Sequence, residues 1–538
     1  MRKIRRLLIA LVVVIAMASP GLTTAGRQPR VEKPDPLLLS DPEVRNAVQV
    51  GSYAPLRKFG RSVRKDKTLS LRERGGGPRP TGTPAPDVVF DGLRTTAGLT
   101  PSDVNGDVGP NHYVQGINAS GGTRIGVYEK DGTLVQDLNL KSLWNKGPCK
   151  NQAQGDPVIQ YDALAGRWLF TQFAFTNTER GPLPPFFECI ALSNTSDPLS
   201  AGRTYTFFVD DEWFPDFPKF GVWGDGYYMT VHLFDKRFNY KGQGIIAFDR
   251  ESMLAGSPPR GSSRDKFPAH YFFGPDDFGA LPSDVAGTTP PPPGTPNYMV
   301  LSKDDNLGAS RDRIDLLEFD VHWNNPRRSK VLLVDRLPTT PFKSVLCGGS
   351  SVCIEQPNSP LALDPLAGEL GVGNFMMYPL TYRNLGGTES LVMNHTVNVG
   401  QNRAGIRWYE ITDPGGTPTI AQQNTFSPPT LNRWNGSISM NGLGEIALGY
   451  SVSGSNRFPS VRFTGREAAD PPGAMEAETS LLEGGGSQLG SNRWGDYSSM
   501  QVDPVDDCTF WYTNQYYNRS RSYQWRTVIG SFKFPGCP

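Results

Sequence analysis

Residues 492–503 read NRWGDYSSMQVD and lead through a turn to the aromatic run FWYT at 510–513. Weaker versions of this order, in which a strand and a tight turn precede an aromatic strand, occupy residues 155–171, 217–230 and 432–450. A supersecondary unit that repeats along a chain is typical of a radial or stacked array of such units. The repeat therefore indicates an architecture, but it names no reaction.

The chain from residue 87 onward has the composition of an all-β protein. Short runs rich in β-branched and aromatic residues alternate with Asp-Gly, Asn-Gly or proline-containing turns. The 59 glycines and 47 prolines of the 538-residue chain supply the turns that many short strands need. Segments of helical period are scarce, and we expect a single surface helix at Ala474–Leu482.

The repeated units number about seven and are ~50 to 75 residues long, which suits a four-stranded propeller blade plus an insertion. They begin near Asp107, Asp156, Phe217, Leu281, Asn358, Arg433 and Arg493. We therefore predict an all-β fold, a β-propeller of seven blades, over residues 87–538. Asp87–Phe90 would supply the outer strand of the last blade. Two packed β-sandwiches are the alternative that the sequence leaves open.

The innermost strand of each propeller blade faces a crowded axis, so small residues are needed there beside aromatic residues that wedge between blades. The small residues that fit inner positions are Gly221, Gly436, Gly495, Ser498 and Ser499. The aromatic residues that fit the wedges are Trp168, Trp223, Trp434 and Trp511.

The first residues have the features of an export signal. Residues 2–6 are mostly basic, and Leu7–Ala18 is an apolar run too short for a membrane span. We therefore predict a signal peptide at 1–25 and a secreted, extracellular mature protein without a membrane span. Adjacent arginines also allow a twin-arginine route, and an uncleaved anchor is the other alternative.

Residues 26–86 differ in composition from the rest of the chain. Proline-rich ends flank a basic and weakly apolar middle, a composition that buries little surface. We predict a linker or pro-segment that is disordered or loosely docked. Its apolar patches at Leu37–Leu39 and Val44–Val48 are the candidates for docking on the main body, and a basic surface-binding tail is the alternative.

The overall charge and the histidine content exclude several partners. The 54 basic and 53 acidic side chains give no net attraction to nucleic acid or anionic membranes. Only five histidines occur, and HExxH and CxxC motifs are absent, which disfavours zinc-dependent hydrolysis. We expect a monomer.

The six cysteines suit an oxidising compartment, where disulfides form and persist. Fifteen pairings exist in principle for six cysteines. Pairing of neighbours in sequence is the economical arrangement, and it joins Cys149 to Cys189, Cys347 to Cys353 and Cys508 to Cys537. The last of these would clamp the terminal strands together. Buried thiols in the reduced state are the alternative.

The segments RWGDYS at 493–498, DCTFWYT at 507–513 and DVNGDVGPNHY at 103–113 resemble a group of secreted bacterial β-propeller proteins that are loosely described as sialidase-like. The resemblance covers about residues 87–538. It implies the fold and export, and it implies no assigned activity. True sialidases carry Asp-boxes of the form Ser-x-Asp-x-Gly-x-Thr-Trp, of which this chain has no clean copy. The resemblance therefore transfers no sialidase chemistry.

The starts of the inner strands of a propeller converge at the channel mouth, which makes residues there candidates for ligand binding. These candidates are Asp156, Lys219, Arg383, Arg433, Arg493, Asp496 and Tyr497, with Tyr382 nearby. Arginines mixed with carboxylates suit an acidic sugar or another carboxylate ligand. The alternative is that these charges pair across blades and hold the ring together.

Catalysis by the same residues would require one of two arrangements. A glycosidase uses two carboxyl groups about 5 to 10 Å apart, or a tyrosine nucleophile with an acidic partner. Asp156 with Asp496 fits the first arrangement, and Tyr497 with Glu389 fits the second.

Asp103, Asn105 and Asp107 place side-chain oxygens at alternate positions, as at the start of a calcium loop. The EF-hand pattern fails, because Val108 occupies its glycine position and Val114 its bidentate glutamate position. A partial calcium site completed by other loops is one interpretation. An Asx-turn that leads into the first blade is the other.

Taken together, these patterns favour a secreted β-propeller that presents a channel-mouth site to a carbohydrate or protein ligand. A sialidase-like glycoside hydrolase with carboxylates and arginines at the same mouth is the alternative. Whether the chain is an enzyme stays open, because no compact nucleophile motif such as Gly-x-Ser-x-Gly occurs. No cofactor is required by the sequence, and calcium is the candidate.

Overall fold

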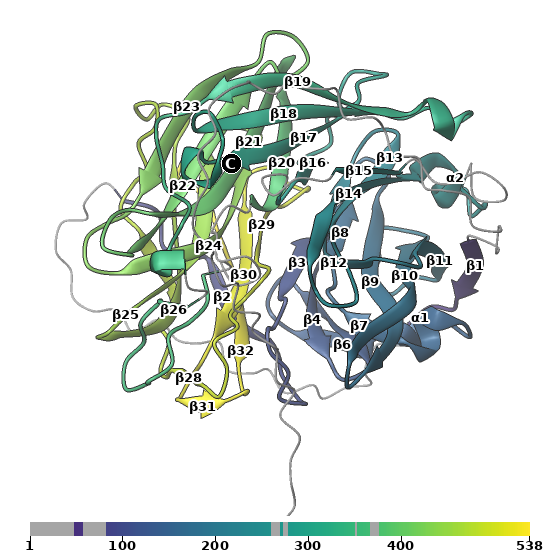
Figure 1. The fold of residues 1–538 in the computed structure, drawn as a ribbon, viewed down its shortest axis with the longest axis horizontal. Helices are drawn as coiled ribbons and strands as arrows, with labels where there is room; N and C mark the ends of the chain where they lie inside the picture. The colour runs from purple at the N-terminus through teal and green to yellow at the C-terminus, as the bar shows by residue number, and fades with distance from the viewer. Residues whose placement is uncertain (1–47, 57–81, 260–268, 273–277, 350–351, 366–375) are drawn as a thin grey trace, which may run out of the picture.

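The computed structural model describes residues 48–56, 82–259, 269–272, 278–349, 352–365 and 376–538 (Figure 1). The predicted signal peptide and most of the predicted linker lie outside these residues. The described chain is built almost entirely of β-strands, which pair as consecutive antiparallel meanders. No helix among the described residues is long and apolar enough to cross a membrane.

The first three meanders use the N-terminal half of the body. The first contains β3 (Asn105–Val108), β4 (His112–Ala119), β5 (Gly122–Glu129) and β6 (Leu134–Asn139). The second contains β7 (Ala153–Gly155), β8 (Ile159–Asp162), β9 (Arg167–Thr178), β10 (Gly181–Ser193) and β11 (Gly202–Asp210). The third contains β12 (Phe214–Val222), β13 (Gly226–Phe234), β14 (Tyr240–Asp249) and β15 (Ala269–Phe272).

The fourth and fifth meanders join into one eight-stranded sheet, because β16 pairs in parallel with β20. The fourth contains β16 (Leu281–Val285), β17 (Asn297–Lys303), β18 (Arg313–Asp320) and β19 (Lys330–Pro338). The fifth contains β20 (Met377–Leu385), β21 (Thr388–Asn398), β22 (Ala404–Thr412) and β23 (Thr419–Phe426). The fifth unit therefore starts later than the expected Asn358.

The sixth and seventh meanders complete the body. The sixth contains β24 (Asn432–Met440), β25 (Ile446–Gly454), β26 (Arg457–Arg466) and β27 (Thr479–Leu482). The seventh contains β29 (Ser499–Val502), β30 (Phe510–Tyr516), β32 (Arg526–Phe532) and β2 (Val88–Arg94). A small pair outside the meanders consists of β28 (Gln488–Leu489) and β31 (Arg521–Ser522). The short helices are η1 (Leu140–Leu143), α1 (Pro148–Asn151), α2 (Arg250–Leu254), η2 (Asp305–Leu307), η3 (Pro326–Arg328) and η4 (Cys347–Gly349).

The inner strands of these meanders form a closed ring. Side chains join each inner strand to the next, as where Ser437 Oγ on β24 accepts from Met500 N on β29 at 2.8 Å. The last inner strand reaches back to the first, because Ser499 Oγ donates to Gly106 O at 2.6 Å and accepts from Gly106 N at 2.8 Å. A closed ring of antiparallel meanders is a β-propeller, as predicted. The described strands supply one meander for each predicted module, and the count of seven blades stays a prediction for the whole chain.

The strand that precedes the first meander completes the last one. β2 pairs antiparallel with β32, with Val88 opposite Ser531 and Phe90 opposite Ile529. In Figure 1 the purple β2 accordingly lies among the yellow C-terminal strands. The predicted closure by Asp87–Phe90 is confirmed. It joins the two ends of the propeller domain in one sheet and covers what would otherwise be an open sheet edge.

Part of the predicted linker is docked as a strand. β1 (Val48–Tyr53) pairs antiparallel with β11 along six residue pairs, on the outer edge of the second meander. Further along, Thr83 N donates to Ala477 O at 3.3 Å. The described parts of segment 26–86, residues 48–56 and 82–86, therefore both contact the body, while the domain boundary at residue 87 stays a prediction.

The expected surface helix at Ala474–Leu482 is wrong. The end of this segment is strand β27, in which Thr479 lies opposite Phe463 and Ser480 opposite Arg462. Leu481 is buried in the core beneath this strand. Edge pairing to β26 satisfies the backbone and buries the leucine, and this tertiary gain outweighs the weak helical period of the segment.

Three of the predicted wedge tryptophans are buried, and one predicted inner-strand glycine lies at a close approach of two strands. Trp168, Trp223 and Trp434 are fully buried. A Cβ added to Gly221 would lie 2.2 Å from Ser283 O on the neighbouring inner strand, so only glycine allows β12 and β16 to approach this closely.

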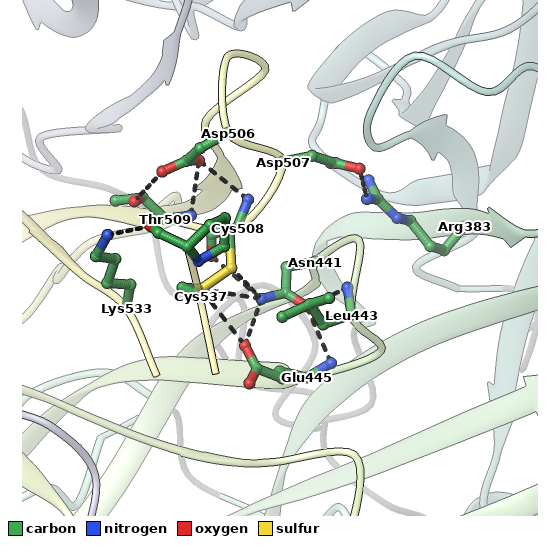
Figure 2. Close-up of a disulfide and its surroundings, with 11 residues drawn as sticks. Arg383, Asn441, Leu443, Glu445, Asp506, Asp507, Cys508, Thr509, Lys533 and Cys537 are labelled. Atoms are coloured by element: carbon green, nitrogen blue, oxygen red, sulfur yellow. Dashed lines mark hydrogen bonds and ion pairs between the residues drawn. A yellow bond between two sulfur atoms is a disulfide. The ribbon is translucent and has the colours of Figure 1, made fainter. Parts of the chain in front are cut away.

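All three disulfides follow the predicted pairing of neighbours, Cys149–Cys189, Cys347–Cys353 and Cys508–Cys537. No described cysteine is free. Cys508–Cys537 connects the start of β30 to the C-terminal segment after β32, beside Asn441 and Glu445 of the sixth meander (Figure 2). The clamp predicted for the terminal strands is therefore present.

The two shorter disulfide loops should contribute unequally to stability. Cys508→Ser/Cys537→Ser opens a 29-residue loop and Cys347→Ser/Cys353→Ser a 6-residue loop. Loop-closure entropy predicts losses of roughly 3.5 and roughly 2 kcal/mol, respectively. Denaturant unfolding of the oxidised proteins measures both free energies. Equal losses would contradict the role of the longer loop as a clamp of the last blade.

Candidate functional site

The starts of several inner strands share an uncommon backbone conformation. Asp103, Asp156, Phe217, Asn435 and Asp496 have φ values of 47°, 48°, 57°, 51° and 67°. Residues other than glycine rarely adopt positive φ, although Asp and Asn tolerate it best. The strand register also shifts next to Phe217 and Asn435, as in a β-bulge. Bulges re-aim side chains, and the positive φ itself recurs at the start of the inner strand in five meanders.

Five residues from four meanders meet at this end of the ring, and we call them the inner-strand cluster: Asp103, Asp156, Lys219, Asp496 and Tyr497. The Tyr497 hydroxyl lies 3.3 Å from Asp156 Oδ2 and 3.0 Å from Pro218 O. Because Tyr497 precedes β29, and Pro218 lies in β12, this hydroxyl connects the seventh meander to the second and third.

Lys219 is the buried cation of the cluster. Its Nζ lies 3.1 Å from the ring centroid of Phe217 and 3.2 Å from that of Tyr497, which places the ammonium between two aromatic faces. This Nζ has no hydrogen-bond partner among the described residues. Burial lowers the pKa of Lys219 from 10.5 to about 7, against the opposing effect of the carboxylates of Asp156 and Asp103. The amine therefore exists in both protonation states near neutral pH.

Asp103 and Asp156 form a carboxyl pair that shares a proton. Burial and, to a smaller extent, the charge of Asp216 raise the pKa of Asp156 from 3.8 to about 7. Burial and the charges of Asp156 and Asp496 raise the pKa of Asp103 well above its usual value. The two carboxyl groups are hydrogen-bonded, so one of them carries the proton. Asn118 orients the pair, because its amide donates to Asp103 Oδ2 and its Oδ1 accepts from Asp156 N at 2.9 Å.

Asp496 is held by Arg493 through one of its oxygens. Arg493 donates to Asp496 Oδ2 from a side chain that is one-third exposed. Burial nevertheless raises the pKa of Asp496, with Arg493 acting in the opposite direction. Asp496 Oδ1 is buried and accepts no hydrogen bond within the described chain. The cluster thus contains an acceptor and a donor, Asp496 Oδ1 and Lys219 Nζ, that both lack a hydrogen-bond partner among the described residues.

Arg383 lies away from this cluster. It is near the end of β20, six residues after Met377, which corresponds to about 20 Å of extended strand. There the buried Arg383 side chain forms an ion pair with the exposed carboxylate of Asp507, beside the Cys508–Cys537 disulfide (Figure 2). The pair connects the fifth meander to the seventh. Arg383 therefore matches the alternative interpretation, in which charges pair between blades.

Arg433 is also occupied by a structural partner. Its guanidinium donates to both oxygens of Glu478 at 2.8 and 2.7 Å, and its side chain is 2% exposed. Tyr450 donates to the same carboxylate at 2.8 Å. These donors hold the pKa of Glu478 at about 2, despite its burial. Glu389, which was expected to serve Tyr497, instead accepts from the Tyr382 hydroxyl.

The metal candidates are not brought together as a calcium loop. Asn105 Oδ1 accepts from Ile159 N at 2.9 Å, and Asp107 Oδ2 accepts from Tyr161 N at 2.7 Å. Both side chains therefore join β3 to β8, while Asp103 faces the inner-strand cluster. The described residues that do place three candidate ligand atoms within 4.8 Å are Asp304 with Asp305 and Asp312, and Glu445 with the disulfide-bonded Cys508 and Cys537.

Sequence reasoning missed Asn118, Glu188 and Asp216 as neighbours of the cluster. Asp216 lies in the segment FPDFPKFGVW, three residues before Lys219, and this acidic position between two prolines was a usable signal. Glu188 is buried within β10, and both burial and the charge of Asp156 raise its pKa well above the usual value. Nothing in the local pattern of β10 distinguishes Glu188 from an outward-facing residue.

No protein-family model matches this chain, and no curated protein matches it in sequence. Solved structures resemble it in fold. Hadza microbial sialidase Hz136 has a TM-score of 0.36 and 10% identity, over 81% of this chain and 65% of the sialidase. A PL25 ulvan lyase has a TM-score of 0.38 and 9% identity, over 83% of this chain and 97% of the lyase. A Penicillium chrysogenum α-L-arabinanase has a TM-score of 0.34 and 10% identity, over 71% of this chain and 99% of the arabinanase. These likenesses assign no residue role.

The raised pKa of Asp156 should make stability pH-dependent. A carboxyl group whose pKa is higher in the folded than in the unfolded state stabilises the fold at low pH, and this contribution is lost as pH rises through the folded value. The Asp156 contribution should therefore fall between about pH 4 and pH 7. Asp156→Asn should gain about 1–3 kcal/mol relative to wild type between pH 5 and pH 8. Denaturant titrations at each pH measure the difference. The exposed Asp211→Asn is the control, and its stability relative to wild type should not change with pH.

Removal of Arg433 should lower the stability of the protein and leave the inner-strand cluster unchanged. Arg433→Met leaves the carboxylate of Glu478 without its bidentate partner, and a loss of about 3–5 kcal/mol is expected for a broken buried pair. Thermal and denaturant unfolding measure this change. Unchanged stability would show that Arg462, which also pairs with Glu478 at 2.7 Å, is a sufficient partner.

Proposed function

We propose that this chain is a secreted carbohydrate-binding β-propeller and that a neutral sugar binds at the inner-strand cluster. The observation that carries the proposal is the pair of buried atoms that make no hydrogen bond with the described residues, Lys219 Nζ and Asp496 Oδ1. A buried polar atom that lacks a hydrogen bond costs free energy, and a ligand hydroxyl can satisfy either atom. A sugar hydroxyl donates to the carboxylate and accepts from the amine with the same group.

The charges around the cluster favour a neutral ligand over an acidic one. Four carboxyl groups, those of Asp103, Asp156, Asp216 and Asp496, interact there with one lysine and one arginine. Arg493 already pairs with Asp496, and the other predicted arginines are engaged elsewhere. A ligand carboxylate would meet like charges without an arginine to receive it. This reasoning replaces the acidic sugar of the sequence-based hypothesis.

The compartment fits an extracellular ligand. The three disulfides need an oxidising environment, which agrees with the predicted export signal. A monomer with no nucleic-acid partner is part of the proposal. A protein ligand would instead require an exposed contact surface, and the buried donor and acceptor of the cluster suit a small group better.

Glycoside hydrolysis is the second candidate, and the pKa of Asp156 favours it. A general acid works best when its pKa lies near the working pH, and burial has moved that of Asp156 to about 7. Asp496 is the other carboxyl group that a two-carboxylate mechanism would use, since its charge acts on Asp156. In that case Asp156 would donate a proton to the leaving oxygen.

Binding should depend on the cluster and not on the nearby surface. On an array of neutral and acidic glycans, wild type should bind neutral members. Lys219→Met and Asp496→Asn should each weaken binding by about tenfold, the loss of one good hydrogen bond. Asp211→Asn should bind as wild type does, and thermal unfolding verifies that each variant is folded. Binding confined to acidic glycans, or unaffected by both cluster variants, would sink the proposal.

The same glycans distinguish binding from hydrolysis. Incubation with wild type should leave bound glycans intact if the chain is a binding protein. If products form, and Asp156→Asn abolishes their formation while glycan binding persists, the second candidate replaces the first. Chromatography of the released sugars provides the measurement.

A further inference from the structure

A cavity of about 360 Å³ lies between the fourth and fifth meanders, within the volume range of small-molecule sites. Its walls come from the loop Pro292–Pro296, Tyr298 on β17, Glu318 on β18, Glu389 on β21 and the turn Asp413–Gly416 after β22. None of these residues belongs to the inner-strand cluster, whose members come from the first, second, third and seventh meanders. The cavity is therefore a separate place on the molecule.

Tyr298 presents a polar group to this cavity without a protein partner. The residue is 1% exposed, and its ring packs edge-on against Trp223 at 5.8 Å between centroids, which fixes its orientation. Its hydroxyl makes no hydrogen bond within the described chain, although the residue lines the cavity. A ligand in the cavity can therefore hydrogen-bond to this hydroxyl, which can both donate and accept.

Three carboxylates surround the same cavity. Burial and the charges of Glu389, Glu318 and Asp413 raise the pKa of Tyr298, which places all three near its hydroxyl. The cavity wall contains no lysine or arginine. Glu389 accepts one hydrogen bond from Tyr382, and Asp413 Oδ2 accepts one from Thr417 N at 2.8 Å. A carboxylate has about four acceptor positions, so each retains capacity for a ligand donor. Lys330 acts on Glu318 from outside the cavity wall, and the net negative charge of the three carboxylates attracts a cation.

The size of the cavity and the spacing of its carboxylates favour an organic cation over a bare metal ion. Glu318, Glu389 and Asp413 are not among the described groups whose ligand atoms lie within 4.8 Å of one another, so they form no compact metal cage. A primary ammonium group has three donors in a tetrahedral arrangement, and its carbon frame occupies space beyond the charge. Carboxylate oxygens with a tyrosine hydroxyl offer the matching acceptors.

We propose that this cavity is a second binding site, specific for a ligand that carries a primary ammonium group. The ammonium lies between Tyr298 and the carboxylates of Glu318 and Glu389, and the rest of the ligand occupies the space beneath the Pro292–Pro296 loop. An amino sugar and a lysine side chain both carry this group, and the proposal concerns the chemistry that they share.

Gly415 keeps the cavity open next to the tyrosine. A Cβ added at this position would lie 2.4 Å from Tyr298 Oη and 3.8 Å from Glu389 Oε2. Its φ is not in the left-handed region, so alanine is compatible with the backbone there. Gly415→Ala therefore obstructs the hydroxyl sterically and leaves every charge in place.

Matched ligand pairs test the charge requirement on the full mature protein. Glucosamine is compared with glucose, and Nα-acetyl-lysine amide with Nα-acetyl-norleucine amide, by ligand-observed NMR titration at low ionic strength. At least one ammonium-bearing member should bind at least tenfold more tightly than its neutral partner. Glu318→Gln, Glu389→Gln and Gly415→Ala should each reduce that binding at least fivefold. The exposed Glu179→Gln is the matched control and should not change it.

Two results would overturn the proposal. Equal binding of charged and neutral partners, or binding that survives all three cavity variants, removes the ammonium requirement. Calcium chloride that binds more tightly than either amine and is lost in the same variants assigns the cavity to a metal instead. Lys219→Met distinguishes the two proposed sites, because it should weaken neutral-glycan binding at the inner-strand cluster and leave ammonium binding at the cavity unchanged.

Discussion

Closure of the ring of inner strands is the constraint on which the rest of this structure depends. Ser499 and Gly106 exchange hydrogen bonds where the last inner strand meets the first, and β2 completes the last sheet beside β32. The Ser499 and Gly106 contacts join residues nearly 400 positions apart, and closing so long a loop costs chain entropy. The pairing of a whole blade offsets this cost. Cys508–Cys537 ties the final segment to the same blade. Without closure, neighbouring meanders would expose their inner faces to water.

Closure also explains why charged groups are buried at the starts of the inner strands. Strands from four meanders converge there, and the side chains of Asp103, Asp156, Lys219 and Asp496 lose contact with water. Desolvation moves the pKa values of the acids up and that of the lysine down. The fold tolerates this arrangement because opposite charges and a shared proton compensate one another. A ligand at this end would complete the compensation.

The two proposed sites are formed by different features of the same fold. The inner-strand cluster arises where all the meanders approach the axis, and positive-φ residues turn the chain into each inner strand. The cavity beside Tyr298 arises where two particular meanders share one sheet through the parallel pairing of β16 and β20. One site therefore depends on the ring as a whole and the other on a single contact between neighbours. Strand residues carry part of the chemistry of both, namely Lys219 at the first and Tyr298 with Glu389 at the second.

The sequence by itself determined the propeller, the closing strand at Asp87–Phe90 and the three disulfides, because repeated local patterns and cysteine spacing carry that information. It also identified Asp156, Lys219, Asp496 and Tyr497 as residues near the axis. Tertiary structure alone decided that Arg383 and Arg433 pair with Asp507 and Glu478, that 474–482 is no helix, and that Glu318, Glu389 and Asp413 share a cavity. Which side chains meet across blades depends on bulges, strand length and burial, and these are set by neighbours distant in the chain.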